Sequence, residues 1–172
     1  MATVTLKGNP CELAGNEIKV GDIAPEVVVV KSADLSEVTV GGAKDKAQLI
    51  VAVPSLDTPV CAMEATKFNH QAAAIDGLEV TVVSMDLPFA AKRFCSTEGV
   101  ENLTVGSDFR NKDFAEAYGV LIASGPLAGV MARCIFVVGK DGKVAYKQLV
   151  PEITDEPNYE EAIAAAKEAA SN

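Results

Sequence analysis

Apolar residues follow two spacings along this chain, one typical of strands and one typical of helices. Short runs of β-branched and other apolar residues, bounded by turn residues, predict strands. These runs cover 27–31, 36–40, 48–53, 78–84, 102–106, 134–138 and 144–150, and residues 2–14 predict an N-terminal hairpin turning at Gly8-Asn9-Pro10. Apolar residues three or four positions apart predict helices over about 59–75, 88–97, 112–118 and 158–170.

The order of these elements predicts an α/β fold. Strand, helix, strand, helix, strand in the middle of the chain implies right-handed crossovers and a parallel core. A glycine-rich turn at 139–142 joins the last two strands and predicts an antiparallel hairpin at the edge. We therefore expect a mixed central sheet with helices on both faces, and the length of 172 residues suits a single domain spanning 1–172.

Composition and charge narrow the possible partners. Apolar residues make up 49% of the chain and charged residues 23%, as in ordinary globular proteins. The net charge of -9 repels phosphate backbones and anionic lipids, so we expect no nucleic-acid or membrane partner. No apolar run approaches the ~20 residues that span a bilayer. The first ten residues lack the features of a secretory signal, which predicts a cytoplasmic protein.

The cysteines are the first sign of chemistry. In a reducing compartment, Cys11, Cys61, Cys95 and Cys134 are expected to be free, which indicates a metal site or redox chemistry. No two of them lie two to four positions apart and His70 is the only histidine, so a zinc site is disfavoured. A Cys-His hydrolase is also disfavoured, because His70 lies nine residues after Cys61 on the same predicted helix.

Cys61 lies where a reactive cysteine is expected. It follows the buried strand 48–53, and reactive groups gather at the carboxyl ends of such strands. Thr58 suits an N-cap and Pro59 the first helical position, so Cys61 falls in the first turn. Free N–H groups and the helix dipole stabilise a thiolate there, and the thiolate is the nucleophile. The apolar stripe Cys61, Ala65, Phe68, Ala72, Ile75 turns the thiol inward.

Other residues allow two interpretations each. Arg133 lies at the start of an apolar strand. It is interpreted either as a strand-end residue in a surface salt bridge or as a cation for the site of Cys61. Cys95, on the next predicted helix, is a half-buried packed thiol or a redox partner. Cys134 lies inside a strand and is expected to be packed and unreactive. Cys11 follows a turn proline, a position open to exposure. The apolar segment 124–131 is a packed connection, a wall beside the site or part of a dimer interface.

A known motif is present at Cys61. Pro54, Thr58 and Cys61 match the Pro-x-x-x-Thr-x-x-Cys signature of peroxiredoxins, with no departure at these positions. The whole chain, from hairpin to last helix, resembles the bacterial thiol peroxidase subfamily, the atypical two-cysteine peroxiredoxins. Lys92-Arg93-Phe94-Cys95, Asp108-Phe109-Arg110 and Arg133 also look like family counterparts. The signature is short, but a second cysteine in a thioredoxin-like chain makes the match specific.

The resemblance implies a role for each of these residues. Cys61 would attack hydrogen peroxide or an alkyl hydroperoxide, and Thr58 would hydrogen-bond the thiolate and a peroxide oxygen. Arg133 would supply the cation, and Pro54 would shield the pocket from water. Cys95 would resolve the Cys61 sulfenic acid as an intramolecular disulfide. The family is an antioxidant one with a thioredoxin-like fold. Its members are dimeric, are recycled by thioredoxin, and need no metal or organic cofactor.

Disulfide closure places a demand on the fold. It needs Cα atoms within roughly 7 Å, and two successive helix starts that flank a strand are usually farther apart. We therefore expect local unwinding around Cys61 and Cys95.

Two other functional classes remain as alternatives to a peroxidase. One is a sensor that passes its oxidation to a partner, and the other is a disulfide exchanger, which normally carries the Cys-x-x-Cys motif that this chain lacks.

Overall fold

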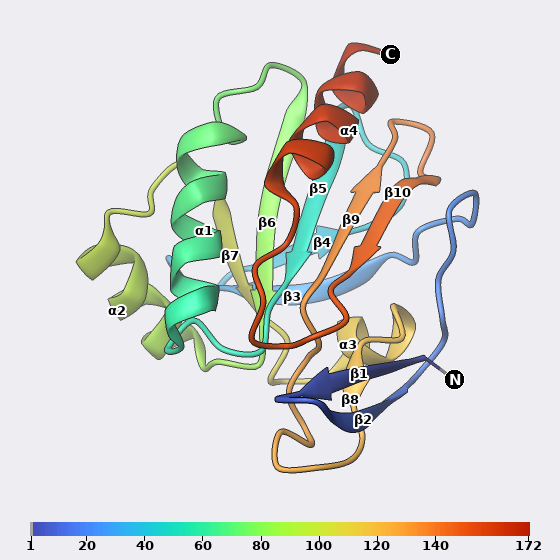
Figure 1. The fold of residues 1–172 in the computed structure, drawn as a ribbon. Helices are drawn as coiled ribbons and strands as arrows, with labels where there is room; N and C mark the ends of the chain where they lie inside the picture. The colour runs from blue at the N-terminus through green and yellow to red at the C-terminus, as the bar shows by residue number, and fades with distance from the viewer. Residues whose placement is uncertain (1) are drawn as a thin grey trace.

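The computed structural model describes residues 2–172 and places a mixed sheet at the centre of the molecule (Figure 1). Within those residues, seven strands pair in the order β10-β9-β5-β6-β7-β3-β4. They are β3 (Val27–Lys31), β4 (Glu37–Val40), β5 (Ala47–Ala52), β6 (Leu78–Ser84), β7 (Thr104–Ser107), β9 (Cys134–Val138) and β10 (Val144–Leu149). β5, β6 and β7 run parallel, and antiparallel pairs flank them on both sides. The predicted parallel core and late hairpin are confirmed.

Helices cover both faces of this sheet, as predicted (Figure 1). They are α1 (Pro59–Gln71), α2 (Pro88–Glu98), α3 (Asp113–Ala117) and α4 (Tyr159–Ser171). Apolar side chains of α1, α2 and α4 pack on the face that presents Leu49 and Val51, whereas α3 packs on the opposite face with Ile50. From residue 2 onward, the chain forms no helix with the length and apolar character needed to cross a membrane.

Some predicted boundaries were wrong. β7 begins at Thr104 rather than at 102. α1 ends at Gln71 rather than 75, because the N–H groups of Ala72 and Ala73 both turn back to the Phe68 carbonyl and close the helix. The N-terminal hairpin turns one position earlier than predicted, at Lys7-Gly8, where both residues have positive φ. Positive φ at both central residues is what a two-residue type I′ turn requires, and Gly8 adopts it without steric cost.

The hairpin, β1 (Thr3–Leu6) and β2 (Asn9–Ala14), extends into a small sheet that the sequence did not reveal. Its third strand is β8 (Leu121–Ile122), which pairs with β2. Cys11 of β2 points into the cluster between this sheet and segment 124–131 and is only 1% exposed, so the expectation that it is exposed was wrong. Leu127 and Val130 of that segment pack against the same cluster, whereas Gly125, Pro126, Ala128 and Gly129 are exposed.

Candidate active site

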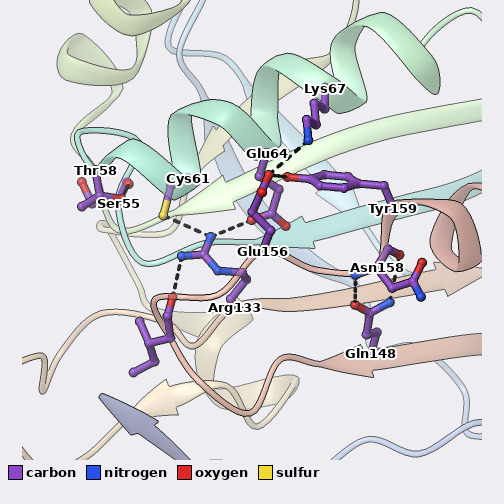
Figure 2. Close-up of polar contacts among 11 residues, drawn as sticks. Ser55, Thr58, Cys61, Glu64, Lys67, Arg133, Gln148, Glu156, Asn158 and Tyr159 are labelled. Carbon is purple, nitrogen blue, oxygen red and sulfur yellow. Dashed lines mark hydrogen bonds and ion pairs between the residues drawn. The ribbon is translucent and has the colours of Figure 1, made fainter. Parts of the chain in front are cut away.

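The loop from β5 to α1 presents Cys61 in the first turn of the helix (Figure 2). Thr58 occupies the N-cap position and Pro59 the first turn, as predicted, while Cys61 is 0% exposed and Pro54 is buried. The Thr58 hydroxyl donates to the Ser55 carbonyl at 2.8 Å. It makes no capping bond and, within residues 2–172, no hydrogen bond to Cys61. In this conformation the Thr58 hydroxyl stabilises the loop and is not hydrogen-bonded to the thiol.

Arg133 contacts Cys61 directly. It precedes β9, and the antiparallel register that pairs Ala52 with Cys134 places it beside the start of the β5–α1 loop. Its NH1 donates to Cys61 Sγ at 3.3 Å, and its NH2 donates to the Ile153 carbonyl at 2.8 Å. Because Arg133 is only 2% exposed, the alternative of a surface salt bridge is wrong. The structure brings a fixed cation to the thiol (Figure 2).

Glu64 completes this cluster, and the sequence analysis missed it. It lies one turn after Cys61 on the inner face of α1, is 0% exposed, and its Oε2 accepts from Arg133 NH1 at 2.6 Å. A carboxylate within an apolar stripe needs a buried partner, which is the signal that could have revealed it. Within residues 2–172, Glu64 Oε1 and Arg133 Nε have no hydrogen-bond partner, so polar capacity remains unused beside the thiol.

Burial and charge pairing act in opposite directions on the pKa values of Glu64 and Arg133. Burial raises the pKa of Glu64 to about 7, although Arg133 acts to lower it. For Arg133, burial acts to lower the pKa, but electrostatic interaction and hydrogen bonding with Glu64 and Cys61 outweigh it and raise the pKa above its ordinary value. Arg133 therefore stays charged. Cys61 and Glu64 share one guanidinium nitrogen, so the two acidic groups compete for the same cation.

The N-terminal hairpin holds the segment that supplies the Ile153 carbonyl. Ile153 N–H donates to the Thr5 carbonyl at 2.8 Å, and Thr5 N–H donates to the Pro151 carbonyl at 2.7 Å. Glu152 accepts from the Thr5 hydroxyl at 3.0 Å and from Gly8 N–H at 2.9 Å. The backbone N–H groups of Thr154 and Gly8 lower the pKa of Glu152 to about 2. The hairpin thus fixes one of the acceptors that orient Arg133.

A second set of polar contacts, made by Lys67, Glu156 and Tyr159, follows the segment that carries Ile153. Lys67 pairs with Glu156 at 3.2 Å, and the Tyr159 hydroxyl donates to the same carboxylate at 2.9 Å. Both members of the ion pair are partly exposed, so the pair itself contributes little stability. It joins α1 to the start of α4, on the same side as the Arg133 cluster (Figure 2).

Cys95 lies on α2, half-buried as predicted, and packs against the apolar cluster that contains Cys61. Burial raises the pKa of Cys95, against which the Ser32 hydroxyl acts. All four cysteines are free thiols, and both helices are intact around Cys61 and Cys95. The unwinding that would join them stays a prediction.

The remaining candidates have structural positions. Burial raises the pKa of the wholly buried Cys134 to about 12, which fits the unreactive thiol that was predicted. His70 is exposed on α1, as expected. In the part of the chain that the structure describes, His, Cys, Asp and Glu side chains form no group of three or more suited to a metal ion.

Comparison with known proteins connects this geometry to a family. The redoxin family profile matches residues 19–163, which include Cys61, Cys95 and Arg133. A thiol peroxidase of Aquifex aeolicus is 61% identical over 166 residues, covering 96% of this chain and 97% of that protein. The chain belongs to the thiol peroxidase group of the redoxin family.

Further relatives of this redoxin agree. A thiol peroxidase of Campylobacter jejuni is 58% identical over 158 residues, covering 92% of this chain and 89% of its own length. The crystal structure of a peroxiredoxin-like protein from Aquifex aeolicus matches with a TM-score of 0.95 at 60% identity, covering 98% of both chains. The predicted thioredoxin-like fold, with its N-terminal hairpin, is confirmed.

Proposed function

We propose that this redoxin is a thiol-specific peroxidase that reduces hydrogen peroxide and alkyl hydroperoxides through Cys61. The observation that carries the proposal is the 3.3 Å contact from Arg133 NH1 to Cys61 Sγ in the first turn of α1. A guanidinium and the free N–H groups of a helix start both stabilise a thiolate. Curated relatives at high identity are thiol peroxidases, which agrees with this use of the site.

The first step is displacement at oxygen. The Cys61 thiolate attacks one peroxide oxygen, an S–O bond forms, the O–O bond breaks, and the departing oxygen leaves as alcohol or water after taking a proton. Arg133 and the N–H groups of the first turn stabilise the charge that develops on that oxygen. Pro54 shields the site from water. Thr58 rotates its hydroxyl from Ser55 to the peroxide, which holds the peroxide in line.

The second step is resolution by Cys95. Its thiol displaces hydroxide from the Cys61 sulfenic acid, so that an S–S bond forms and water leaves. Burial raises the pKa of Cys95, so while α2 is folded its thiol stays protonated and attacks peroxide poorly. Unwinding exposes the thiol, which gives up its proton as it attacks the sulfenic acid. The first turn of α1 and the turn of α2 around Cys95 unwind for the two sulfurs to meet.

The cycle closes when thioredoxin reduces the disulfide. We place the protein in the cytoplasm as a homodimer, with residues 1–172 as one catalytic domain, and its role is antioxidant defence and redox homeostasis. Hydroperoxide and thioredoxin are then its redox partners, and neither step requires a metal or organic cofactor.

Peptide mapping by mass spectrometry tests the proposal. Reduced protein receives one equivalent of hydroperoxide, is alkylated and is digested. The expected product is a Cys61–Cys95 crosslink with Cys11 and Cys134 still free. A Cys134→Ala variant serves as matched control and should give the same crosslink. A Cys61 that stays a thiol refutes the peroxidase, whereas a Cys61 that stops at sulfenic acid removes the role of Cys95.

Turnover separates an enzyme from a sensor. With thioredoxin, its reductase and NADPH present, a peroxidase consumes many equivalents of hydroperoxide per protein molecule. A sensor that passes its disulfide to a partner protein stops at one equivalent under the same conditions.

A further inference from the structure

One carboxylate joins the two segments that carry the redox cysteines. Asp86 lies between β6 and α2, two residues before the helix begins at Pro88. Its carboxylate accepts hydrogen bonds from the Ser55 hydroxyl at 2.7 Å, the Leu56 N–H at 2.7 Å and the Ser84 hydroxyl at 2.8 Å. The first two donors belong to the β5–α1 loop, so Asp86 clamps that loop to the end of the neighbouring strand.

Further hydrogen bonds connect this clamp to Thr58 at the start of α1, the helix that carries Cys61. The Ser55 carbonyl accepts from Thr58, whose hydroxyl is 2.8 Å away, and the Ser55 hydroxyl also accepts from Asp57 N–H at 3.2 Å. Thr58 is the N-cap of α1, and Ser55 and Thr58 lie together at the helix start beside Cys61 (Figure 2). The bonds to Asp86 therefore fix the position from which the first turn of α1 begins.

Asp86 is itself held on its other side. Its carbonyl accepts from the Ser107 hydroxyl at 2.6 Å, at the end of β7, and its N–H donates to the Ser84 hydroxyl at 3.2 Å. The carboxyl ends of β5, β6 and β7 are thus tied together at this one residue, directly before the helix that carries Cys95. A carboxylate suits the position, because ionised oxygens accept several short hydrogen bonds and donate none.

We infer that Asp86 is a positioning residue that holds the 54–58 loop for reaction with peroxide and limits how far α1 unwinds toward Cys95. This inference rests on the proposed function. With the clamp intact, the segment free to move on unwinding begins after Leu56. Without it, the free segment begins at Pro54, and a longer free segment lets Cys61 reach Cys95 through more conformations. The same loss misplaces Thr58 and the first turn for the attack on peroxide.

The two steps therefore respond in opposite directions to loss of the clamp, and single-turnover kinetics measures both. Asp86→Ala, Asp86→Asn and wild-type protein are mixed rapidly with hydroperoxide, quenched at intervals and alkylated, and Cys61 thiol, sulfenic acid and disulfide are quantified by mass spectrometry. Asp34→Ala is the matched control. Asp34 accepts from the N–H and hydroxyl of Ser36 in the turn between β3 and β4, so its loss removes similar bonds elsewhere.

In Asp86→Ala we expect Cys61 thiol to be consumed roughly tenfold more slowly, because aligned hydrogen bonds to a charged group are lost. Conversion of sulfenic acid to disulfide should be faster than in wild type. Asp86→Asn keeps the shape and part of the acceptor capacity of Asp86. Both of its rates should therefore lie between those of wild type and those of Asp86→Ala. Asp34→Ala should match wild type in both steps.

Unchanged rates in both Asp86 variants overturn the inference, and so does a slowing of both steps together, which is what general loosening of the site would produce. Circular dichroism monitors folding, and if Asp86→Ala does not fold, the Asp86→Asn rates decide. Failure of the proposed function is visible separately, because wild-type protein would then form no Cys61–Cys95 disulfide at all.

Discussion

Glu64 and Arg133 form an ion pair that solvent does not reach. Oε2 and NH1 are 2.6 Å apart, and the two side chains are 0% and 2% exposed. Desolvation of two charges is costly, so such a pair adds little net stability, but removal of one partner leaves the other uncompensated. The pair is best understood through what it does to the guanidinium. It fixes one edge of Arg133, so that the same nitrogen also faces Cys61.

Replacement of Arg133 by lysine should slow the reaction of Cys61 with hydroperoxide by about 100-fold or more, a size typical of losing one fixed donor to a developing oxyanion. A single ammonium cannot reach Cys61, Glu64 and the Ile153 carbonyl together, as the planar guanidinium does. Quenched-flow measurement of Cys61 oxidation checks this. Arg110→Lys, which alters an exposed pair with Glu37, is the matched control and should be neutral. Equal rates for the two variants would contradict the role of Arg133.

Glu64→Gln should slow the same reaction by about tenfold, because a neutral amide holds the guanidinium edge less firmly than a carboxylate. Glu64→Ala should in addition destabilise the fold by roughly 3–5 kcal/mol, since it leaves the Arg133 charge buried without its carboxylate partner. Quenched-flow rates and urea unfolding measure the two effects. Glu160→Gln, on the exposed side of α4, is the control. A Gln variant as fast as wild type would show that Arg133 is oriented without Glu64.

Glu64 also predicts a pH dependence of stability. Burial raises its pKa in the folded protein to about 7, above the ordinary value of 4.5. Between these values the folded state holds a proton that the unfolded state releases. The stabilisation linked to this proton is fully present below pH 4.5 and is lost as the pH rises through about 7. Urea unfolding at pH 5 and pH 8 should show this loss in wild type but not in Glu64→Gln, and identical losses would contradict it.

Glu152 predicts the opposite dependence. Backbone N–H groups of Thr154 and Gly8 lower its pKa to about 2, below the ordinary value of 4.5. Its contribution is present above pH 4.5 and is lost as the pH falls through about 2. Glu152→Gln should therefore lower the thermal unfolding midpoint at pH 7 and have a much smaller effect near pH 2. Glu12→Gln, an exposed carboxylate on the same hairpin, is the control. Equal midpoints at pH 7 would show that the hairpin is held without this charge.

The sequence predicted those parts of the molecule that depend on local spacing. Thr58 and Pro59 marked the helix start, and with it the position of Cys61, because capping and the first turn involve neighbouring residues. The partnership of Glu64 with Arg133 spans 69 positions and depends on the register of β9 against β5, which periodicity does not contain. β8 was missed because two residues are too short to show a period.

Cys11 and Asp86 show the same limit in other ways. The burial of Cys11 depends partly on β8, Leu127 and Val130, more than a hundred residues away, so its neighbours in the chain show only part of its surroundings. Asp86 looks like an ordinary turn residue in sequence. Its importance lies in three donors that converge from two segments, and only the three-dimensional arrangement reveals them.

The complete burial of Cys61 means that the folded site is closed. With 0% of its surface exposed, the thiol touches no solvent in this conformation, so any reagent reaches it only after the surrounding loop opens. Cys11 and Cys134 are also buried, which leaves the half-buried Cys95 as the thiol most open to such reagents. A thiol-labelling survey of the folded protein should therefore mark Cys95 first and leave Cys61 unlabelled.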